Sequence, residues 1–199
     1  MSNSIAQQSA PKRHYRLGRR AEKQQETRRR IVEAAVDLHG TLGPAHTSVV
    51  QIAERAGIQR HTFYAHFPDE RSLFMACSGL ALERDPLPDL TDVRKMPAGR
   101  DRIRNGLEEI YGWYERNAQL VGCVMRDAEY HALTREMVEL RIAPAFGEAA
   151  EVLGEGLDAR SRALLDIALD FGCWRLLGRT HGIAAAAALM GDAITKVSR

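Results

Sequence analysis

A run of hydrogen-bonding side chains near residue 60 has the clearest potential for chemistry in this sequence. Its members are Gln59, Arg60, His61, Thr62, Tyr64 and His66. Guanidinium, amide, imidazole and hydroxyl groups of this kind can bond to DNA base edges and to phosphate oxygens. The alternative is an ordinary helical hairpin whose polar face is solvated, but a neighbouring basic segment favours DNA binding.

That basic segment opens the chain. Residues 1–80 hold 12 Lys and Arg against 7 Asp and Glu, whereas residues 81–199 hold 16 against 19. Residues 1–30 alone hold 9 against 2 and show no hydrophobic period. We therefore predict a disordered basic arm over residues 1–24 that contacts DNA phosphates, with a merely solubilising tail as the alternative.

Residues that could support catalysis or bind a metal do not form a working set. Glu108 and Glu109 are adjacent, so on a helix they point about 100° apart and cannot share one substrate atom. His61 and His66 are five positions apart, a poor fit to the i, i+4 pair of a helical metal site. No nucleophile elbow, P-loop or dinucleotide-binding glycine motif occurs in the sequence. We predict no catalytic residue, metal or cofactor, and a helical enzyme is the least favoured alternative.

The elements that must position the run near residue 60 are predicted to be helices. A helical apolar period from Ile31 to Leu38 indicates a first helix that stops by Gly43 and Pro44, since proline cannot continue a helix. A short helix then begins at Ser48.

This short helix carries its own start and stop signals. Ser48 and Gln51 have the spacing of a capping box, and Gly57 ends the helix. A second short helix follows over residues 59–66, and Asp69 caps a fourth. Two short helices joined at a glycine are the shape of a helix-turn-helix.

The segment from Ile31 to Phe74, and especially QIAERAGIQRHTFYAHFPDERSLF, resembles the N-terminal domain of the TetR family of bacterial transcriptional regulators. Three features occur at the spacing of the family's motif: a threonine before the second helix, an Ile-Ala-x-x-Ala-Gly core and a Tyr-x-x-Phe pair. This resemblance implies base contacts by Gln59, Arg60, His61 and Thr62, and phosphate contacts by Thr47, Tyr64 and His66.

Four positions depart from the family's usual pattern. His39 replaces a usual phenylalanine, and a buried histidine there needs a hydrogen-bond partner. Gln59 stands where serine is a common cap, and His61 replaces a usual glycine. Glu70 replaces the usual phosphate-binding lysine, so we expect Arg71 to substitute for it. The operator sequence therefore cannot be transferred from relatives.

The predicted fold is all-α with two domains. The helix-turn-helix domain and a connecting helix occupy residues 25–84, a proline-containing connector spans 85–99, and a larger helical domain spans 100–199. Helices in this second domain are predicted near residues 100–118, 121–131, 134–153, 160–180 and 184–197. Pro144 predicts a kink or a break near Ile142.

The last two predicted helices are expected to form a homodimer interface. The segment from Ser161 to Gly178 is apolar on nearly every side, and a helix buried all round needs two partners. A four-helix bundle with a second copy would supply them, as the resemblance also implies, and capping of a monomeric core is the alternative. The expected interface residues are Leu165, Leu169, Cys173, Leu176, Leu189 and Ala193.

Aromatic residues and methionines of the second domain are candidates for a ligand pocket. They are Tyr111, Trp113, Tyr114, Met125, Tyr130, Met137, Phe146 and Trp174. At helical spacing such residues are equally typical of a plain core. The resemblance implies a small-molecule effector between these helices, but not its chemistry.

The location and the role follow from these features. No apolar run approaches the roughly 20 residues of a membrane span, no secretory signal is visible, and the three scattered cysteines suit reduced thiols. We therefore expect a cytoplasmic protein with no membrane partner. Its predicted role is that of a dimeric repressor that binds double-stranded DNA at a palindromic operator and is released by an effector. An architectural DNA-binding protein without an effector is the alternative.

Overall fold

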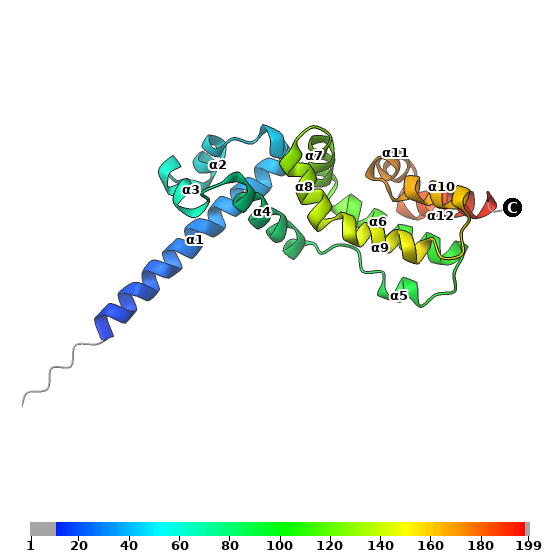
Figure 1. Ribbon diagram of the computed structural model, residues 1–199, viewed down its shortest axis with the longest axis horizontal. Helices are drawn as coiled ribbons and strands as arrows, with labels where there is room; N and C mark the ends of the chain where they lie inside the picture. The colour runs from blue at the N-terminus through cyan, green and yellow to red at the C-terminus, as the bar shows by residue number, and fades with distance from the viewer. Residues whose placement is uncertain (1–10, 198–199) are drawn as a thin grey trace, which may run out of the picture.

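The computed structural model describes residues 11–197, and every regular element among them is a helix, as the all-α prediction requires. The molecule is elongated (Figure 1). A long first helix projects at one end, small helices surround its C-terminal half, and the helices nearest the C-terminus form the other end.

The first helix, α1 (Pro11–Thr41), begins earlier than predicted. The expected disordered arm over residues 1–24 is wrong for residues 11–24, which are helical, and residues 1–10 lie outside the described residues. This stretch is rich in Ala, Glu, Gln, Lys and Arg, which are good helix formers. Further along α1, Arg29 pairs with Glu26 at 2.8 Å and with Glu33 at 2.9 Å. The missing hydrophobic period therefore reflects a solvated helix.

Two short helices follow α1 through a 3-10 turn, η1 (Pro44–His46), and they form the predicted helix-turn-helix. They are α2 (Val49–Ala56) and α3 (Arg60–His66). The capping box is confirmed, because Ser48 Oγ accepts from the Gln51 N–H at 3.3 Å and the Ser48 N–H donates to Gln51 Oε1 at 2.8 Å. Gly57 ends α2 at φ 64°, a left-handed conformation that favours glycine.

The fourth helix, α4 (Glu70–Arg84), completes a small N-terminal domain, which we call the reading head. Asp69 caps it as predicted, accepting from the Ser72 N–H at 2.6 Å. The core of the reading head contains the buried side chains Ile31, Val32, Ala34, Ala35, Ile52, Ala56, Phe63, Phe67, Leu73 and Cys77. These residues come from all four helices, so α3 is held by α1, α2 and α4.

The connector after α4 contains a single helical turn, α5 (Thr91–Arg94). The next four helices are α6 (Arg100–Arg116), α7 (Ala118–Ala128), α8 (Ala132–Arg141) and α9 (Ala143–Leu153). The predicted break near Ile142 is confirmed, because α8 ends one residue before it and α9 starts one residue after it, with Pro144 in its first turn. Proline has no N–H to donate, so it is tolerated at a helix start.

The last three helices are α10 (Ala159–Leu169), α11 (Phe171–His181) and α12 (Ile183–Lys196). The single helix predicted across residues 160–180 is wrong, since Asp170 separates two helices. Its carboxylate accepts from the Gly172 N–H at 2.6 Å and caps α11. An aspartate is unfavourable inside a helix and strongly favoured at a cap, so the sequence did hold a signal for this break.

The C-terminal core forms around α6, which packs against α12 and contacts α9, α10 and α11. Tyr111 and Tyr114 of α6 are buried, and their hydroxyls donate to the carbonyls of Ala168 at 2.9 Å and Leu169 at 2.7 Å. Burial raises the pKa of both phenols. Both hydroxyls therefore stay protonated and tie α6 to the end of α10.

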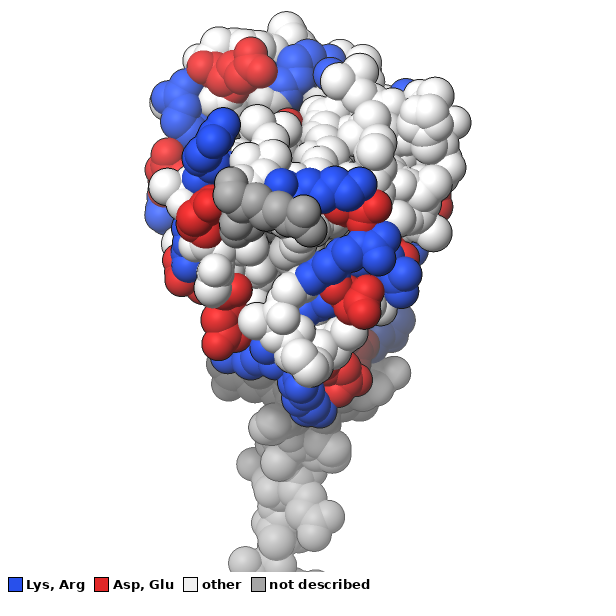
Figure 2. Space-filling view, turned by 90° about the vertical axis from the view of Figure 1, so that its right-hand side faces the viewer, with Lys and Arg blue, Asp and Glu red and all other residues white. Residues whose placement is uncertain are grey.

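Charge is unevenly distributed over the C-terminal end of the molecule. Figure 2 looks onto this end and shows Lys, Arg, Asp and Glu mixed over its left and lower parts, with a broad uncharged area at its upper right. Within residues 11–197, no helix is both long enough and apolar enough to cross a membrane.

Candidate DNA-binding face and effector cavity

The short helix α3 presents its polar side chains on the surface. Gln59, Arg60, His61 and Tyr64 are exposed, whereas Phe63 is buried in the core of the reading head. Thr62 and His66 are half-buried at the edges of this face. The structure therefore brings together six of the residues predicted to contact DNA.

Arg60 and Tyr64 lie one turn apart on the exposed face of α3 and touch each other. Arg60 Nη2 donates to the Tyr64 hydroxyl at 3.3 Å, and the guanidinium carbon lies 5.7 Å from the centre of the ring. The Tyr64 side chain is 44% exposed although nearby aromatic rings are buried. Arg60 and Tyr64 together place a cation next to a hydroxyl group, a combination suited to contacts with bases and phosphates.

Two arginines of α1 stabilise the position of α3 through contacts with the backbone around it. Arg28 of α1 donates to the carbonyl of His66 at 3.0 Å and lies 4.1 Å from the centre of the Phe67 ring. Arg30 donates to the carbonyls of Ala56 and Gly57, at the turn between α2 and α3. Arg28 and Arg30 therefore stabilise the position of α3. In the sequence they had counted only toward the positive charge of the N-terminal segment.

Two further residues predicted to bind phosphate lie outside α3. Thr47 is half-buried immediately before α2, and its hydroxyl donates to the carbonyl of Gly43 at 2.8 Å. Arg71 forms an ion pair with Glu136 of α8 at 2.8 Å. This pair links the reading head to the C-terminal domain through Nε of Arg71, and the exposed side chain keeps its Nη groups available for a phosphate.

A buried carboxylate also joins the two domains. Asp127 of α7 is fully buried and accepts hydrogen bonds from the Ala45 N–H at 2.9 Å, the Tyr130 hydroxyl at 2.8 Å and Arg126 Nε at 2.7 Å. Burial raises the pKa of Asp127, but these hydrogen bonds outweigh it and hold the pKa below its ordinary value. We call Asp127 and its three partners the Asp127 latch. It fastens α7 to the turn that leads into α2.

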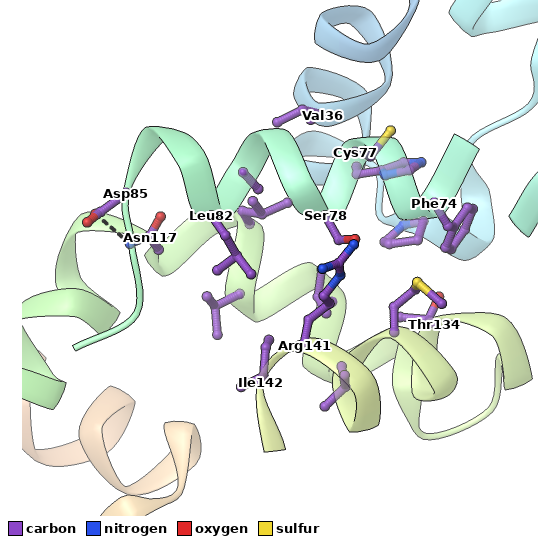
Figure 3. Close-up of a pocket in the computed structure, with 18 of the residues that line it drawn as sticks. Val36, Phe74, Cys77, Ser78, Leu82, Asp85, Asn117, Thr134, Arg141 and Ile142 are labelled. Atoms are coloured by element: carbon purple, nitrogen blue, oxygen red, sulfur yellow. Dashed lines mark hydrogen bonds between the residues drawn. The ribbon is translucent and has the colours of Figure 1, made fainter. Parts of the chain in front are cut away.

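A cavity of about 100 Å³ lies at the same junction, between α1 and α4 of the reading head and α7 and α8 of the C-terminal domain (Figure 3). Its lining is mostly apolar. The lining includes His39, Phe74, Ser78, Asp85, Trp113 and Arg141.

The predicted pocket residues divide between several places. Trp113 and Met137 line this cavity. Three others line a separate surface groove of about 550 Å³ beside α7, α9 and α11; these are Tyr114, Met125 and Phe146.

The remaining three predicted pocket residues line neither space. Tyr111 and Trp174 belong to the closed C-terminal core, so their prediction as pocket residues is wrong. Tyr130 is largely exposed and serves in the Asp127 latch. His39 and Arg141 also line the cavity and were not predicted as pocket residues, because contacts between two domains leave no local pattern in the sequence. Only the unusual histidine at position 39 hinted at this site.

His39 differs from its expected role. Its side chain is only 6% exposed, yet it makes no hydrogen bond to any residue that the structure describes, so the expected partner is not found. Its ring lies 5.2 Å from the Phe74 ring and faces the cavity. Burial lowers the pKa of His39 from 6.5 to about 4, so the imidazole is neutral at pH 7.

The pKa of His39 predicts a pH dependence of stability. Because the unfolded chain takes up this proton near pH 6.5 and the folded protein does so near pH 4, stability should fall as the pH drops between these values. We expect the free energy of unfolding to be lower by about 1 kcal/mol at pH 5.5 than at pH 7.5. Urea unfolding of His39→Phe should lack this part of the pH dependence. Identical pH profiles for the two proteins would contradict the burial of a neutral His39.

The predicted dimer residues also separate into two groups. Leu165 and Leu169 are buried in the chain's own core, so their prediction as interface residues is wrong, because α10 packs that side inward. Leu176 on α11 and Leu189 on α12 are 72% and 52% exposed. Cys173 and Ala193 are half-buried. An apolar face is therefore open on α11 and α12.

Among the side chains that the structure describes, no group of three His, Cys, Asp or Glu lies close enough together to hold a metal ion. The two histidines considered as metal ligands in the sequence, His61 and His66, both lie on α3.

Comparison with known proteins supports the reading head. The family model described as bacterial regulatory proteins, tetR family, matches residues 31–77. This confirms the resemblance that the Ile-Ala-x-x-Ala-Gly core indicated. A search of curated proteins found no match.

Solved structures share the fold over most of the chain. The transcriptional regulator FadR from Bacillus subtilis, in complex with stearoyl-CoA, is 18% identical, with 83% of this chain and 96% of that chain covered and a TM-score of 0.58. A tetR-family transcriptional regulator from Streptomyces coelicolor is 21% identical, with 87% and 82% covered and a TM-score of 0.57. The shared fold is a helix-turn-helix domain followed by a larger helical domain.

Proposed function

Because the family model of bacterial regulatory proteins, tetR family, matches residues 31–77 of this chain, we propose that the protein represses transcription by occupying a palindromic operator as a homodimer. The observation that carries the proposal is α3, a short helix that is locked by Phe63 and exposes Gln59, Arg60, His61 and Tyr64. A helix of this kind, second in a helix-turn-helix, enters the major groove of DNA. Such a role places the protein in the cytoplasm, where bacterial DNA lies.

Two reading heads are needed for tight binding. A single helix-turn-helix buries little surface on DNA, and dimers reach two half-sites about 34 to 36 Å apart. The open apolar face of α11 and α12, with Leu176 and Leu189, supports a four-helix bundle between two copies. Its burial also removes apolar surface from water.

The position of the cavity supports release by a small effector. The cavity has walls from both domains, and the Asp127 latch and the Arg71–Glu136 pair cross the same junction. An effector that fits the cavity better in one arrangement of the reading head shifts the population toward that arrangement. A near-complete switch needs about 5.5 kcal/mol of preference for the released arrangement. An architectural DNA-binding protein without an effector would show no such response.

Arg60→Ala tests the recognition helix. A base contact by an arginine contributes about 1 to 3 kcal/mol, so the variant should bind its operator roughly 5-fold to 150-fold more weakly while binding to unrelated DNA changes little. Fluorescence anisotropy with an inverted repeat from the DNA flanking the gene measures both affinities. Tyr64→Phe serves as the comparison, since loss of a phosphate contact should weaken both. Unchanged operator affinity in Arg60→Ala would show that α3 does not read bases.

A further inference from the structure

The cavity contains one positive charge that nothing in the described chain neutralises. Arg141, the last residue of α8, is half-buried and lines the cavity, and its Nε atom is fully buried without a hydrogen-bond partner. Its guanidinium forms no ion pair or hydrogen bond with any side chain or backbone group that the structure describes. Figure 3 shows the side chain extending from α8 toward Ser78 on α4. The Ser78 hydroxyl donates elsewhere, to the carbonyl of Met75 at 3.2 Å.

The other titratable groups that line the cavity do not offset this charge. Asp85 is bound at its own end of the cavity by Arg116 Nε at 2.9 Å and by Asn117 Nδ2 at 2.8 Å. These bonds hold the pKa of Asp85 below its ordinary value, and Arg116 balances its charge. His39 is neutral at pH 7 because its pKa is about 4, and burial raises the pKa of Cys77 to about 12. Among the described residues that line the cavity, Arg141 is therefore the only one with an uncompensated charge.

A buried donor without an acceptor is costly, and a guanidinium is shaped to receive a carboxylate through two parallel hydrogen bonds. The rest of the wall is apolar, with aliphatic side chains and the rings of Phe74 and Trp113. The size of the cavity, about 100 Å³, is of the same order as the roughly 150 Å³ cavity that holds benzene in another protein. A space of this order suits a ligand the size of one ring or a short chain.

From these observations we propose that the cavity binds a small carboxylic acid with an apolar body, its carboxylate on Arg141 and its body between α4 and α7. This inference rests on the proposed effector role of the cavity and adds the chemical class of the ligand. His39 lies on the wall as a neutral hydrogen-bonding group that has no partner of its own. A cation is disfavoured, since it would lie beside Arg141 without a free carboxylate to balance it.

Three probes of one shape test the charge preference. Benzoate, benzyl alcohol and benzylamine are titrated into the full-length protein without DNA and followed by ligand-observed NMR, with Trp113 fluorescence as a second signal. We expect benzoate to bind at least about tenfold more tightly than either of the others, because hydrogen bonds to charged groups favour the acid by that order. Equal or tighter binding of the alcohol or the amine would overturn the proposal. So would the absence of benzoate binding in the millimolar range.

Variants of Arg141 test the residue. Arg141→Gln should weaken benzoate binding by about tenfold to a hundredfold and leave benzyl alcohol unchanged, whereas Arg141→Lys should retain part of the affinity because it keeps the charge but not the paired donors. Arg160→Gln, on the exposed start of α10, is the matched control. Since Arg141 makes no hydrogen bond to the described chain, its variants should fold, and circular dichroism checks this. Unchanged benzoate affinity in Arg141→Gln would overturn the proposal.

The same titration separates this inference from the proposed function. Because it uses no DNA, a protein that fails to bind any operator would refute the repressor role while the benzoate result still decides the ligand class. Conversely, a protein that binds an operator and releases it with a neutral ligand would keep the repressor role and refute the acid.

Discussion

Leu189→Glu is expected to turn a dimer into a monomer and to lower operator affinity by at least about a hundredfold. Leu189 lies exposed on α12, and Leu176 is exposed on the neighbouring α11, where we propose that a second copy packs. A carboxylate at this place would be buried against apolar side chains without a partner, which costs several kcal/mol. Each monomer would then hold DNA through one reading head only. Light scattering measures the mass, and anisotropy measures the affinity.

The control for this variant is the same substitution at another exposed leucine. Leu140 of α8 is 47% exposed and lies outside α11 and α12, so Leu140→Glu adds the same charge without touching the proposed interface. It should remain dimeric. A dimeric Leu189→Glu protein would refute the interface on α11 and α12. A monomeric Leu140→Glu protein would indicate that the interface includes α8 instead.

Local signals in the sequence were sufficient to predict the reading head. Capping at Ser48 and Asp69, a left-handed Gly57 and a helical apolar period each act within a few residues, so their effect can be read without knowledge of the fold. The break at Ile142 was predictable for the same reason, since Pro144 acts on its own turn. Asp170 carried an equally local signal, but the apolar residues around it outweighed that signal in the sequence analysis.

The cavity could not be predicted in this way. It joins His39 of α1, Phe74 of α4 and Arg141 of α8, and no period or motif links residues so far apart in the sequence. Residue type alone also misled the pocket prediction, because Tyr111 and Trp174 pack in a closed core while a histidine from the reading head lines the cavity. Packing against the other helices likewise decides which face of α10 is buried. Because Leu165 and Leu169 lie on that buried face, they are not part of an interface with a second copy.

Asp127→Ala is expected to loosen the junction between the two domains. The substitution leaves the Ala45 N–H, the Tyr130 hydroxyl and Arg126 without their shared acceptor. Loss of hydrogen bonds to a buried charge should lower the free energy of unfolding by about 2 to 3 kcal/mol, as measured by urea unfolding at pH 7. Tyr130→Phe removes one of the three bonds to Asp127, together with the exposed contact of the Tyr130 hydroxyl to His46 Nε2 at 3.0 Å, and should cost about 1 kcal/mol.

The pH dependence distinguishes the Asp127 latch from His39. Because the pKa of Asp127 is held below 3.8 in the folded protein, its contribution is fully present above that value and is lost only as the pH falls through the folded pKa. The difference in stability between wild type and Asp127→Ala should therefore stay constant from pH 7.5 to 5.5, where His39 accounts for the decline in both proteins. If the latch transmits the effector signal, Asp127→Ala should still bind operator DNA but respond less to any ligand that releases the wild type. Wild-type stability together with wild-type release in this variant would show that α7 and the turn before α2 are joined by other contacts.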